Sequence, residues 1–506
     1  MKLSFLSIFV GLAVGFALAV PELERRNTGF LISMDTPTIF EQGNSIDLTR
    51  RVSTNSTLDF DDIQGDILIG MSKNKETFFF FSIQDATTFK SKLSSDIKAL
   101  VTSTNQILNT TLQPTTAVNI AFSSSGLAAL NVTDDLGDSD FTGGQFADAN
   151  NLGDPGTSNW VSAFTGTDIH GVFLFASDTA QNIDDQITNV QSILGDSINE
   201  SYRLDGAARP DDEEGHEHFG YLDGVSQPVV EGVQDPLPGQ ASVAAGTILV
   251  GTDGDGISRP SWAIGGSFLV FRQLQQKVPE FNKYVQDHAL NVSGLTSEEN
   301  ADLFGARLVG RWKSGAPIDL SPLRDDPTIG ADNTMNNNFT YDHPEISGFD
   351  ISTNQTFCPF SAHTRKTRPR SDFGTEAANV HHIIRAGIPY GPEVTDDETA
   401  SNTSSTDSSL ERGLAFVAYQ SDIADGFKFM QQAWVDNFNF FKASTGVDPI
   451  IGRQDGTAAD ALRNITGTNP LDFDEVVTLD IDFVVSRGGE YFFSPPISAL
   501  SGALAS

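Results

Sequence analysis

The sequence predicts an α+β fold made of two ferredoxin-like domains, each an antiparallel sheet with helices. Three observations lead to this prediction. Runs typical of strands and helices alternate in the first half, runs of the same type return in the second half, and the 506 residues exceed one ordinary domain. The hydrophobic content of 39% is typical of a globular chain with substantial cores.

The first half supplies the clearest alternation. Strand-like runs lie at residues 63–70, 77–83, 118–122 and 170–176, and apolar residues at helical spacing predict helices over 85–108 and 181–194. This order is typical of a ferredoxin-like sheet with helices on one face. Residues 205–256 are rich in Gly, Pro and Asp, which predicts a long loop, and loops of that length usually serve a function.

The second half repeats the type of the first without a clear sequence repeat. Strands are expected at 266–275 and 414–420, and helices at 281–290, 297–309 and 423–440, the last amphipathic. Residues 393–409 are rich in Ser, Thr and Asp and predict an exposed loop. The predicted division is a signal peptide over 1–19, an irregular lead-in or propeptide over 20–58, an N-terminal domain over 59–260 and a C-terminal domain over 261–506.

The N-terminus predicts secretion. Lys2 precedes an apolar stretch from Leu3 to Ala19 that ends in small residues, as a signal peptide does. A membrane anchor is the alternative, but polar sequence follows at once and no second apolar run reaches spanning length. Surface glycosylation of a secreted chain is expected at some of the Asn-X-Ser/Thr motifs, which begin at Asn55, Asn109, Asn131, Asn199, Asn291, Asn338, Asn354, Asn402 and Asn464.

The composition also excludes partners. A formal net charge of −36 argues against binding to nucleic acid or to anionic membranes. It is compatible with an acidic working medium or simply with solubility. With a single cysteine the chain has no internal disulfide, so its stability comes from its cores.

One histidine stands among apolar and small residues and is followed by cations, in the run Cys358-Pro-Phe-Ser-Ala-His363-Thr-Arg-Lys-Thr. A buried neutral imidazole can bind haem iron, and nearby cations can meet the porphyrin carboxylates. Asp223 lies upstream in a glycine-flanked loop and Arg385 lies downstream, which completes the set that a haem peroxidase needs. Cys358 is either a thiolate ligand or a buried small hydrophobe. Without a second cysteine, haem attachment through a Cys-X-X-Cys-His motif is excluded.

A rival constellation is His216-Glu217-His218, which follows four acidic residues at 211–214. Two histidines with several carboxylates can bind a divalent metal ion. Only a strand would align residues 216 and 218 on one face.

Several motifs together resemble the dye-decolorizing peroxidase family. They are Phe-Gly-Tyr-Leu-Asp-Gly-Val-Ser-Gln-Pro at 219–228, Trp-Ala-Ile-Gly-Gly-Ser-Phe at 262–268, Val-Gly-Arg-Trp-Lys-Ser-Gly-Ala-Pro at 309–317, the histidine run, and Ile-Pro-Tyr-Gly at 388–391. Gly-X-X-Asp-Gly alone is weak, but the ordered set is specific and spans roughly residues 60–500. The secreted, glycosylated type resembles the fungal enzymes of the family. The resemblance implies one non-covalent haem b per chain, bound between the two domains and mainly by the second.

The resemblance also assigns roles at the haem. His363 is implied as the proximal iron ligand, and a carboxylate on its far nitrogen would raise its basicity. Asp448 is the candidate for that carboxylate, or else a turn-forming aspartate before proline. Asp223 is implied as the distal acid–base, whose low ordinary pKa would keep it unprotonated in acid. Arg385 is implied to stabilise charge on the departing peroxide oxygen, with a structural ion pair as the alternative.

Further residues are implied around the cofactor. Arg365, two residues after the ligand, is expected to pair with a haem propionate, and Arg311 is a second candidate. Leu414 and Phe416 are expected to line the distal pocket and exclude water, or to be ordinary strand core. Tyr390 and Trp434 are candidates for a surface relay that passes electrons from dyes too bulky to reach the haem, or they are ordinary packing.

The function predicted is a secreted haem peroxidase. Hydrogen peroxide is the oxidant, and dyes of the anthraquinone type or phenolic and lignin-related compounds are oxidised in one-electron steps. The alternatives are a related haem protein that acts on another small oxidant or on haem itself, and a non-enzymatic extracellular binding glycoprotein. The sequence leaves the oligomeric state open between monomer and dimer.

Overall fold

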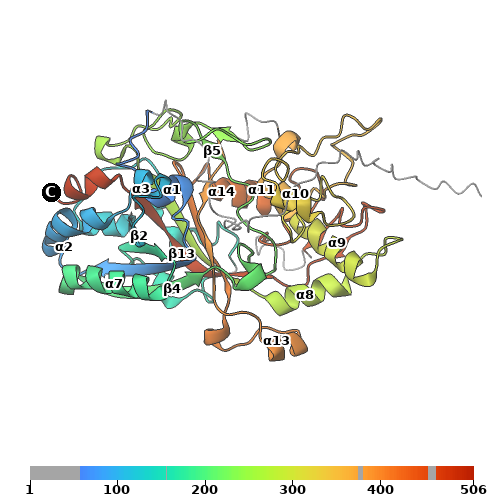
Figure 1. Cartoon of the computed structure of the whole chain (residues 1–506), viewed down its shortest axis with the longest axis horizontal. Coiled ribbons are helices and arrows are strands. Elements are labelled where there is room, and N and C mark those ends of the chain that lie inside the picture. The colour runs from blue at the N-terminus through green and yellow to red at the C-terminus, as the bar shows by residue number, and fades with distance from the viewer. Residues whose placement is uncertain (1–56, 155, 374–379, 454–462) are drawn as a thin grey trace, which may run out of the picture. The chain divides into compact units, whose positions relative to one another are not determined.

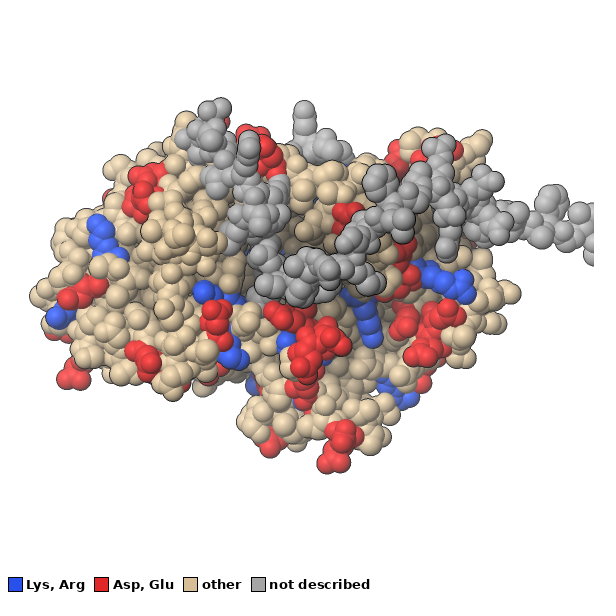
Figure 2. All heavy atoms as spheres, in the orientation of Figure 1, with Lys and Arg blue, Asp and Glu red and all other residues tan. Residues whose placement is uncertain are grey.

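The computed structural model describes residues 57–506 except 155, 374–379 and 454–462. The predicted signal peptide, nearly all of the predicted lead-in, and Asn55 lie outside the described residues. No helix among the described residues is long and apolar enough to cross a membrane. Acidic side chains are spread over the face shown in Figure 2, in keeping with the net charge of −36.

Strands from both halves form one closed antiparallel sheet. The first half contributes β1 (Lys75–Ile83), β2 (Thr116–Ser123), β3 (Gly171–Ser177) and β4 (Ile198–Ala207), and the second contributes β7 (Ser267–Gln276), β8 (Ile384–Arg385), β9 (Ile388–Tyr390), β10 (Gly413–Gln420) and β13 (Val484–Ser494). The order is β7-β13-β2-β3-β1-β4-β9-β10-β8, and a further β7–β10 pairing closes the ring. The two predicted antiparallel sheets are therefore confirmed, and they join edge to edge as a barrel.

The phenylalanines of β1 show why this strand is buried on both faces. Successive side chains point to opposite faces of a sheet. Phe78 and Phe80 belong to the cluster inside the barrel, whereas Phe79 and Phe81 belong to the cluster outside it. The outer cluster includes residues of α2 (Ala86–Lys92) and α7 (Ala180–Leu194), which cover the outside of the sheet (Figure 1).

The second half adds helices and loops beyond its strands. They include α8 (Val278–Asp287), α9 (Ser297–Val309), α10 (Pro327–Ala331) and α11 (His363–Thr367). Thr296 and Glu299 form a capping box that starts α9, and Gly310 ends the helix at a φ of 93° that favours glycine. The remaining short elements are α4 (Ser124–Ala129), α5 (Ser139–Gly143), α6 (Gln145–Asp148), β5 (Val229–Val230), β6 (Ser242–Val243), β11 (Asn464–Ile465) and β12 (Val477–Thr478).

Several predicted elements are wrong or broken. The run at 63–70 forms a short helix, α1 (Gly65–Ile69), because a short apolar run that is buried all round does not distinguish helix from strand. The helix predicted over 85–108 is divided among α2, a π-helical and a 3-10 turn, and α3 (Thr104–Leu108). The helix predicted over 423–440 shortens to α14 (Phe427–Phe429) and a π turn (Met430–Val435). Strand β13 was missed because its paired glycines at 488–489 interrupt the strand pattern.

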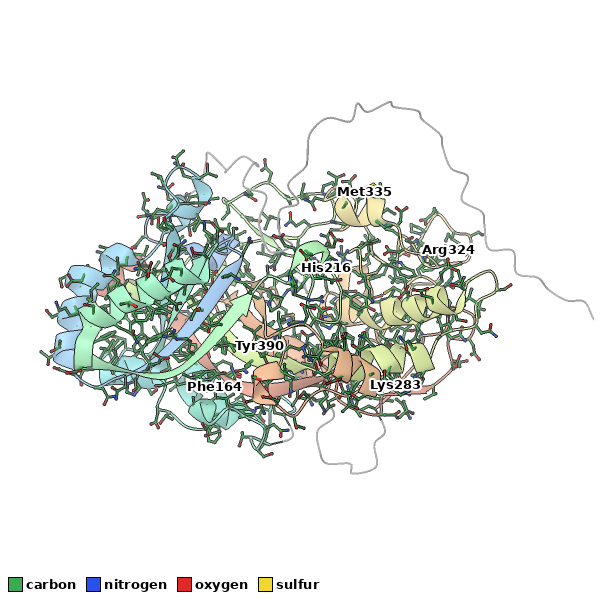
Figure 3. The ribbon with its side chains drawn as sticks, turned by 60° about the horizontal axis from the view of Figure 1, so that its bottom comes forward. Phe164, His216, Lys283, Arg324, Met335 and Tyr390 are labelled. Atoms are coloured by element: carbon green, nitrogen blue, oxygen red, sulfur yellow. The ribbon has the colours of Figure 1, made fainter. Side chains whose placement is uncertain are left out.

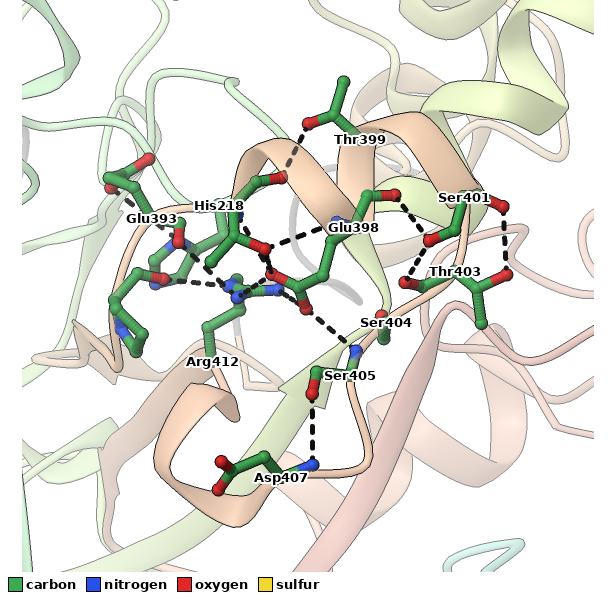
Figure 4. A network of polar contacts seen from close by, with 12 residues as sticks. His218, Glu393, Glu398, Thr399, Ser401, Thr403, Ser404, Ser405, Asp407 and Arg412 are labelled. Carbon is green, nitrogen blue, oxygen red and sulfur yellow. Dashed lines mark hydrogen bonds and ion pairs between the residues drawn. The ribbon is translucent and has the colours of Figure 1, made fainter.

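The segment 393–409 differs most from its prediction as an exposed loop. It contains α13 (Asp396–Ser401), capped by Thr395 and Glu398. Glu398 is buried and pairs with the buried Arg412 at 2.7 Å, and backbone N–H groups of Thr395 and Ser405 donate to the same carboxylate (Figure 4). The polar composition of this segment therefore serves an internal network as well as solvent.

Candidate active site

A cavity of about 300 Å³ opens beside the barrel and brings together most of the predicted site residues. His363, Asp223 and Arg385 line it, and so do Leu414 and Phe416 of β10. The lining comes from the loop after β4, from β8 and β10, and from α11. Residues that lie far apart in the sequence thus meet at one place.

His363 is the first residue of α11 and is held by Asp448. Its Nδ1 lies 2.7 Å from Asp448 Oδ2, and the other oxygen of that carboxylate accepts the N–H groups of Ile450 and Ile451. Burial lowers the pKa of His363, but the charge of Asp448 and its hydrogen bond together outweigh burial, so the pKa is raised. Because Nδ1 is occupied, Nε2 is left for a ligand on the cavity side.

Asp223 and Arg385 form an ion pair on the cavity wall. Arg385 Nη1 donates to Asp223 Oδ1 over 2.7 Å, and the N–H of Gly224 donates to the same oxygen. Gln227 exchanges two hydrogen bonds with the backbone of Arg385, which ties the Asp223 loop to β8. Burial raises the pKa of Asp223, but the charge of Arg385 and its hydrogen bond hold that pKa below the usual value. The carboxylate therefore stays ionised to a lower pH than an unpaired aspartate.

The structure gives Arg365 partners other than the predicted haem propionate. Its guanidinium makes two hydrogen bonds to the buried carboxylate of Asp372, at 2.6 and 2.7 Å, and a third to the carbonyl of Cys358. It also lies 4.6 and 4.5 Å from the ring centroids of Tyr341 and Phe360. The side chain does not line the cavity, and each of its three guanidinium nitrogens already has a hydrogen-bond partner inside the protein.

Other arginines line the cavity in its place. Arg311, the second candidate for a propionate partner, lines the cavity and also donates to the backbone carbonyls of Gly315 and Asn336. Arg368 lines the cavity, and its side chain makes no hydrogen bond or ion pair with the described residues; burial, and then the charge of Arg370, lower its pKa to about 10. Arg370 also lines it, with Nε unpartnered among the described residues. The sequence shows all three arginines of 365–370, but only the fold selects which of them face the cavity.

The two predicted relay residues are buried, so neither is a surface aromatic. Trp434 is 3% exposed, lines the cavity and stacks on Phe440 with ring centroids 5.5 Å apart. Tyr390, which is labelled in Figure 3, is 4% exposed and belongs to the core inside the barrel. Its hydroxyl donates to Glu411 over 3.0 Å. Trp434 also contacts Phe373, which is 38% exposed; the centroids of the two rings lie 5.8 Å apart.

The structure does not support the two alternative sites, a metal site at His216-Glu217-His218 and a haem ligand at Cys358. His218 is buried with Nε2 bonded to the Tyr390 carbonyl, and burial lowers its pKa to about 4. Glu217 accepts the N–H groups of Phe219 and Tyr221. Within the described residues no three His, Cys, Asp or Glu side chains form a group that could hold a metal ion. Cys358 is buried and does not line the cavity, so it is not placed to bind a haem there; burial raises the pKa of its thiol to about 12.

The residues present fit a haem. His363 faces a largely apolar cavity with its Nε2 free, and the guanidinium groups of Arg311, Arg368 and Arg370 on the cavity wall could bind two haem propionates. Unpartnered buried atoms on the same wall, Nε of Arg370 and Oγ1 of Thr364, indicate that the protein was built around a polar partner.

Comparisons with known proteins agree with this fit. Residues 62–210 match the model of the DyP dimeric alpha+beta barrel domain, and residues 230–441 match that of the Dyp-type peroxidase C-terminal domain. The chain is 59% identical to dye-decolorizing peroxidase msp1 of Mycetinis scorodonius over 89% of each chain. It is 56% identical to Peroxidase 2 of the same organism over 100% of each chain. The crystal structure of a fungal DyP-type peroxidase from Auricularia auricula-judae, 53% identical, superposes with a TM-score of 0.85 and covers 89% of this chain and 100% of its own.

The boundary between the two matched models falls within 211–229, whereas the predicted boundary at 260/261 stays a prediction. The match over both halves decides against the non-enzymatic binding protein. The chain belongs to the dye-decolorizing peroxidases, a family of enzymes that hold haem b without covalent attachment and oxidise dyes with hydrogen peroxide.

Proposed function

We propose that this peroxidase binds its haem through Nε2 of His363 and activates hydrogen peroxide with Asp223 and Arg385. The observation that carries the proposal is that His363 and the Asp223–Arg385 pair line one cavity. The haem supplies the redox chemistry when it is bound. The chain supplies the proton transfers, the charge and the exclusion of water.

Asp223 is the group that moves the proton. Its ionised carboxylate takes a proton from the nearer oxygen of the peroxide and returns it to the leaving oxygen. Arg385 remains charged throughout and stabilises negative charge on that leaving oxygen. Leu414 and Phe416 keep the cavity apolar above the reacting atoms, which strengthens both effects. Asp448 fixes the ring of His363 and keeps Nε2 directed away from itself.

The propionates are assigned to Arg368 and Arg370, with Arg311 beside them. Arg368 brings a charge that no described carboxylate neutralises, and Arg370 brings an unpartnered Nε. An ionised propionate would give each guanidinium the charge-assisted bond that it lacks. Arg365 instead ties α11 to the segment that follows it, by binding the carboxylate of Asp372.

Electrons from bulky dyes and phenols would pass through Trp434, because it lies against the cavity and contacts the partly exposed Phe373. Tyr390 is a second relay candidate through its hydrogen bond to Glu411. Replacement of Trp434 by Phe should slow large dyes while small phenols keep their rate. Equal rates for both substrate classes would remove Trp434 from the path.

The chain is further proposed to be secreted and glycosylated. The signal-peptide pattern at 1–19 supports secretion, and the acceptor asparagines at 109, 131, 199, 291, 338 and 402 are exposed. A monomer or a dimer remains compatible with these features.

An absorption spectrum of the purified protein tests the proposal. A Soret band that shifts on one equivalent of hydrogen peroxide and returns on addition of an anthraquinone dye is the expected result. Replacement of His363 by Ala should change the Soret band of the resting protein, whereas replacement of the buried His218 should not. An unchanged spectrum in the His363 variant would overturn the assignment of the ligand.

A further inference from the structure

Asp223 lines a second, much smaller cavity on its other side. This cavity of about 70 Å³ has a polar wall formed by Asp66, Ser72, Lys73, Glu76, His216, Glu217 and Asp223. A volume of this size holds water-sized molecules but excludes a dye. Asp223 is therefore shared between the wall of the large cavity and the wall of the small one.

Glu76 is the residue of this wall that the proposed mechanism leaves unexplained. It lies on β1 and is only 7% exposed, yet its Oε1 has no hydrogen-bond partner among the described residues, and neither does Oγ of Ser72. Leaving a buried polar atom unpaired costs about 1–3 kcal/mol. Such atoms on the wall of a polar cavity are normally satisfied by ordered water.

Burial and the neighbouring carboxyl group of Asp66 both favour the protonated form of Glu76. Tyr419 donates to Asp66 Oδ2 over 2.6 Å, which fixes one carboxyl group beside the other. Burial, and then the charge of Asp66, raise the pKa of Glu76 well above its usual value, and burial raises the pKa of Asp66 to about 7. Two neighbouring buried carboxyl groups retain at least one proton between them, because both cannot ionise cheaply.

We propose that water in the small cavity connects Glu76 to Asp223, and that Glu76 supplies through Asp223 the protons consumed when substrates return electrons to the enzyme. These protons are additional to the one that Asp223 moves from one peroxide oxygen to the other. In this step an O–H bond of Glu76 breaks, an O–H bond forms transiently on Asp223, and the proton then passes to oxygen on the haem side, so that Asp223 ends as a carboxylate again. The transfer itself changes no oxidation state. A proton from solvent then restores Glu76, entering the small cavity where the half-buried Lys73 and His216 line it. The inference rests on the proposed role of Asp223, and Glu76 acts only through that residue.

The reaction needs such a supply. Reduction of hydrogen peroxide to two waters consumes two protons and two electrons. A phenol brings a proton with its electron, whereas ferrocyanide brings an electron alone. The titratable groups facing Glu76 are Asp66 from α1, Tyr419 from β10, Lys73 from the preceding turn, and His216, Glu217 and Asp223 from the loop after β4.

The first test does not use turnover. Infrared difference spectra between pH 5 and pH 9 should show protonated-carboxyl bands in the apoprotein and in the haem protein, and Glu76→Gln should lose one of them. The matched control is Glu490→Gln, since burial also raises the pKa of Glu490 to about 7 but this residue lies on neither cavity. An unchanged set of carboxyl bands in Glu76→Gln would overturn the proposal.

The second test measures turnover with ferrocyanide and with a phenol. Glu76→Gln should slow ferrocyanide oxidation by about 100-fold, the lower end of what a positioned proton donor contributes, with a larger solvent isotope effect. The phenol rate should fall much less, Glu76→Asp should restore part of the ferrocyanide rate, and Glu490→Gln should change neither. If Glu76→Gln does not fold, Ser72→Ala tests the same water chain and should slow ferrocyanide selectively.

The outcomes separate this inference from the proposed function. If Asp223→Asn is inactive while Glu76→Gln behaves like Glu490→Gln with both donors, the relay is wrong and the role of Asp223 stands. If Asp223→Asn is fully active, the proposed mechanism fails, and the relay fails with it.

Discussion

Two aspartate–arginine pairs in this molecule have nearly the same shortest N···O distance and opposite surroundings. Asp223 and Arg385 lie 2.7 Å apart with 25% and 29% of their side chains exposed, on the wall of the large cavity. Arg365 and Asp372 lie 2.6 Å apart with 3% and 1% exposed, away from it. The distance alone does not reveal the role. Access to a cavity makes the first pair available for chemistry. In the enclosed pair, every guanidinium nitrogen and both carboxylate oxygens are already hydrogen-bonded inside the protein.

The largest effect is expected at the open pair. Asp223→Asn removes the proton acceptor but keeps the size of the side chain, so peroxide activation should fall by roughly 10²- to 10⁴-fold. The Soret band and the unfolding midpoint should stay close to those of the parent. Stopped-flow spectra after mixing with peroxide measure the loss, and a variant that reacts at the parent rate would contradict the role of Asp223.

The enclosed pair should respond in stability instead. Arg365→Leu leaves the carboxylate of Asp372 buried without its partner, which costs about 3–5 kcal/mol in the free energy of unfolding. Urea denaturation of the apoprotein measures this loss. The double variant with Asp372→Leu should recover much of it, because two apolar groups replace the ion pair. A stable Arg365→Leu protein that binds haem weakly would instead return Arg365 to the propionates.

A third arginine, Arg368, sharpens the contrast because it faces the cavity without a partner. Arg368→Leu should weaken haem binding by about 1.5–3 kcal/mol, the value of a hydrogen bond to a charged group. It should leave the stability of the apoprotein unchanged or raised, since the isolated buried charge is removed. Haem titration of the apoprotein gives the affinity, and equal affinity in variant and parent would exclude Arg368 as a propionate partner.

The fold class could be predicted, and so could the choice of His363 and Asp223 as cavity residues, because their signals are local. The alternating strands and helices predict the sheets, and the runs around His363 and Asp223 pick out two residues that line the large cavity. The arginine that meets the cavity could not be chosen, because Arg365 and Arg368 stand one helical turn apart and only the position of Asp372 separates them. Glu76 carried no signal at all. It belongs to an ordinary strand pattern, and only closure of the barrel brings it into the cavity behind Asp223.

The smallest effect is expected at a second enclosed pair, Glu398 and Arg412, which extends the comparison to pH. Burial raises the pKa of Glu398, but hydrogen bonds from Arg412 and from backbone N–H groups outweigh it and lower that pKa to about 2. A depressed folded pKa gives stability that is fully present above the ordinary value of 4.5 and is lost as pH falls toward about 2. Glu398→Gln should therefore destabilise the protein at pH 6 and lose this difference at pH 2–3, as measured by thermal unfolding across that range. A difference that stayed constant with pH would show that the carboxylate charge contributes nothing, and that the pair is held by shape and neutral hydrogen bonds.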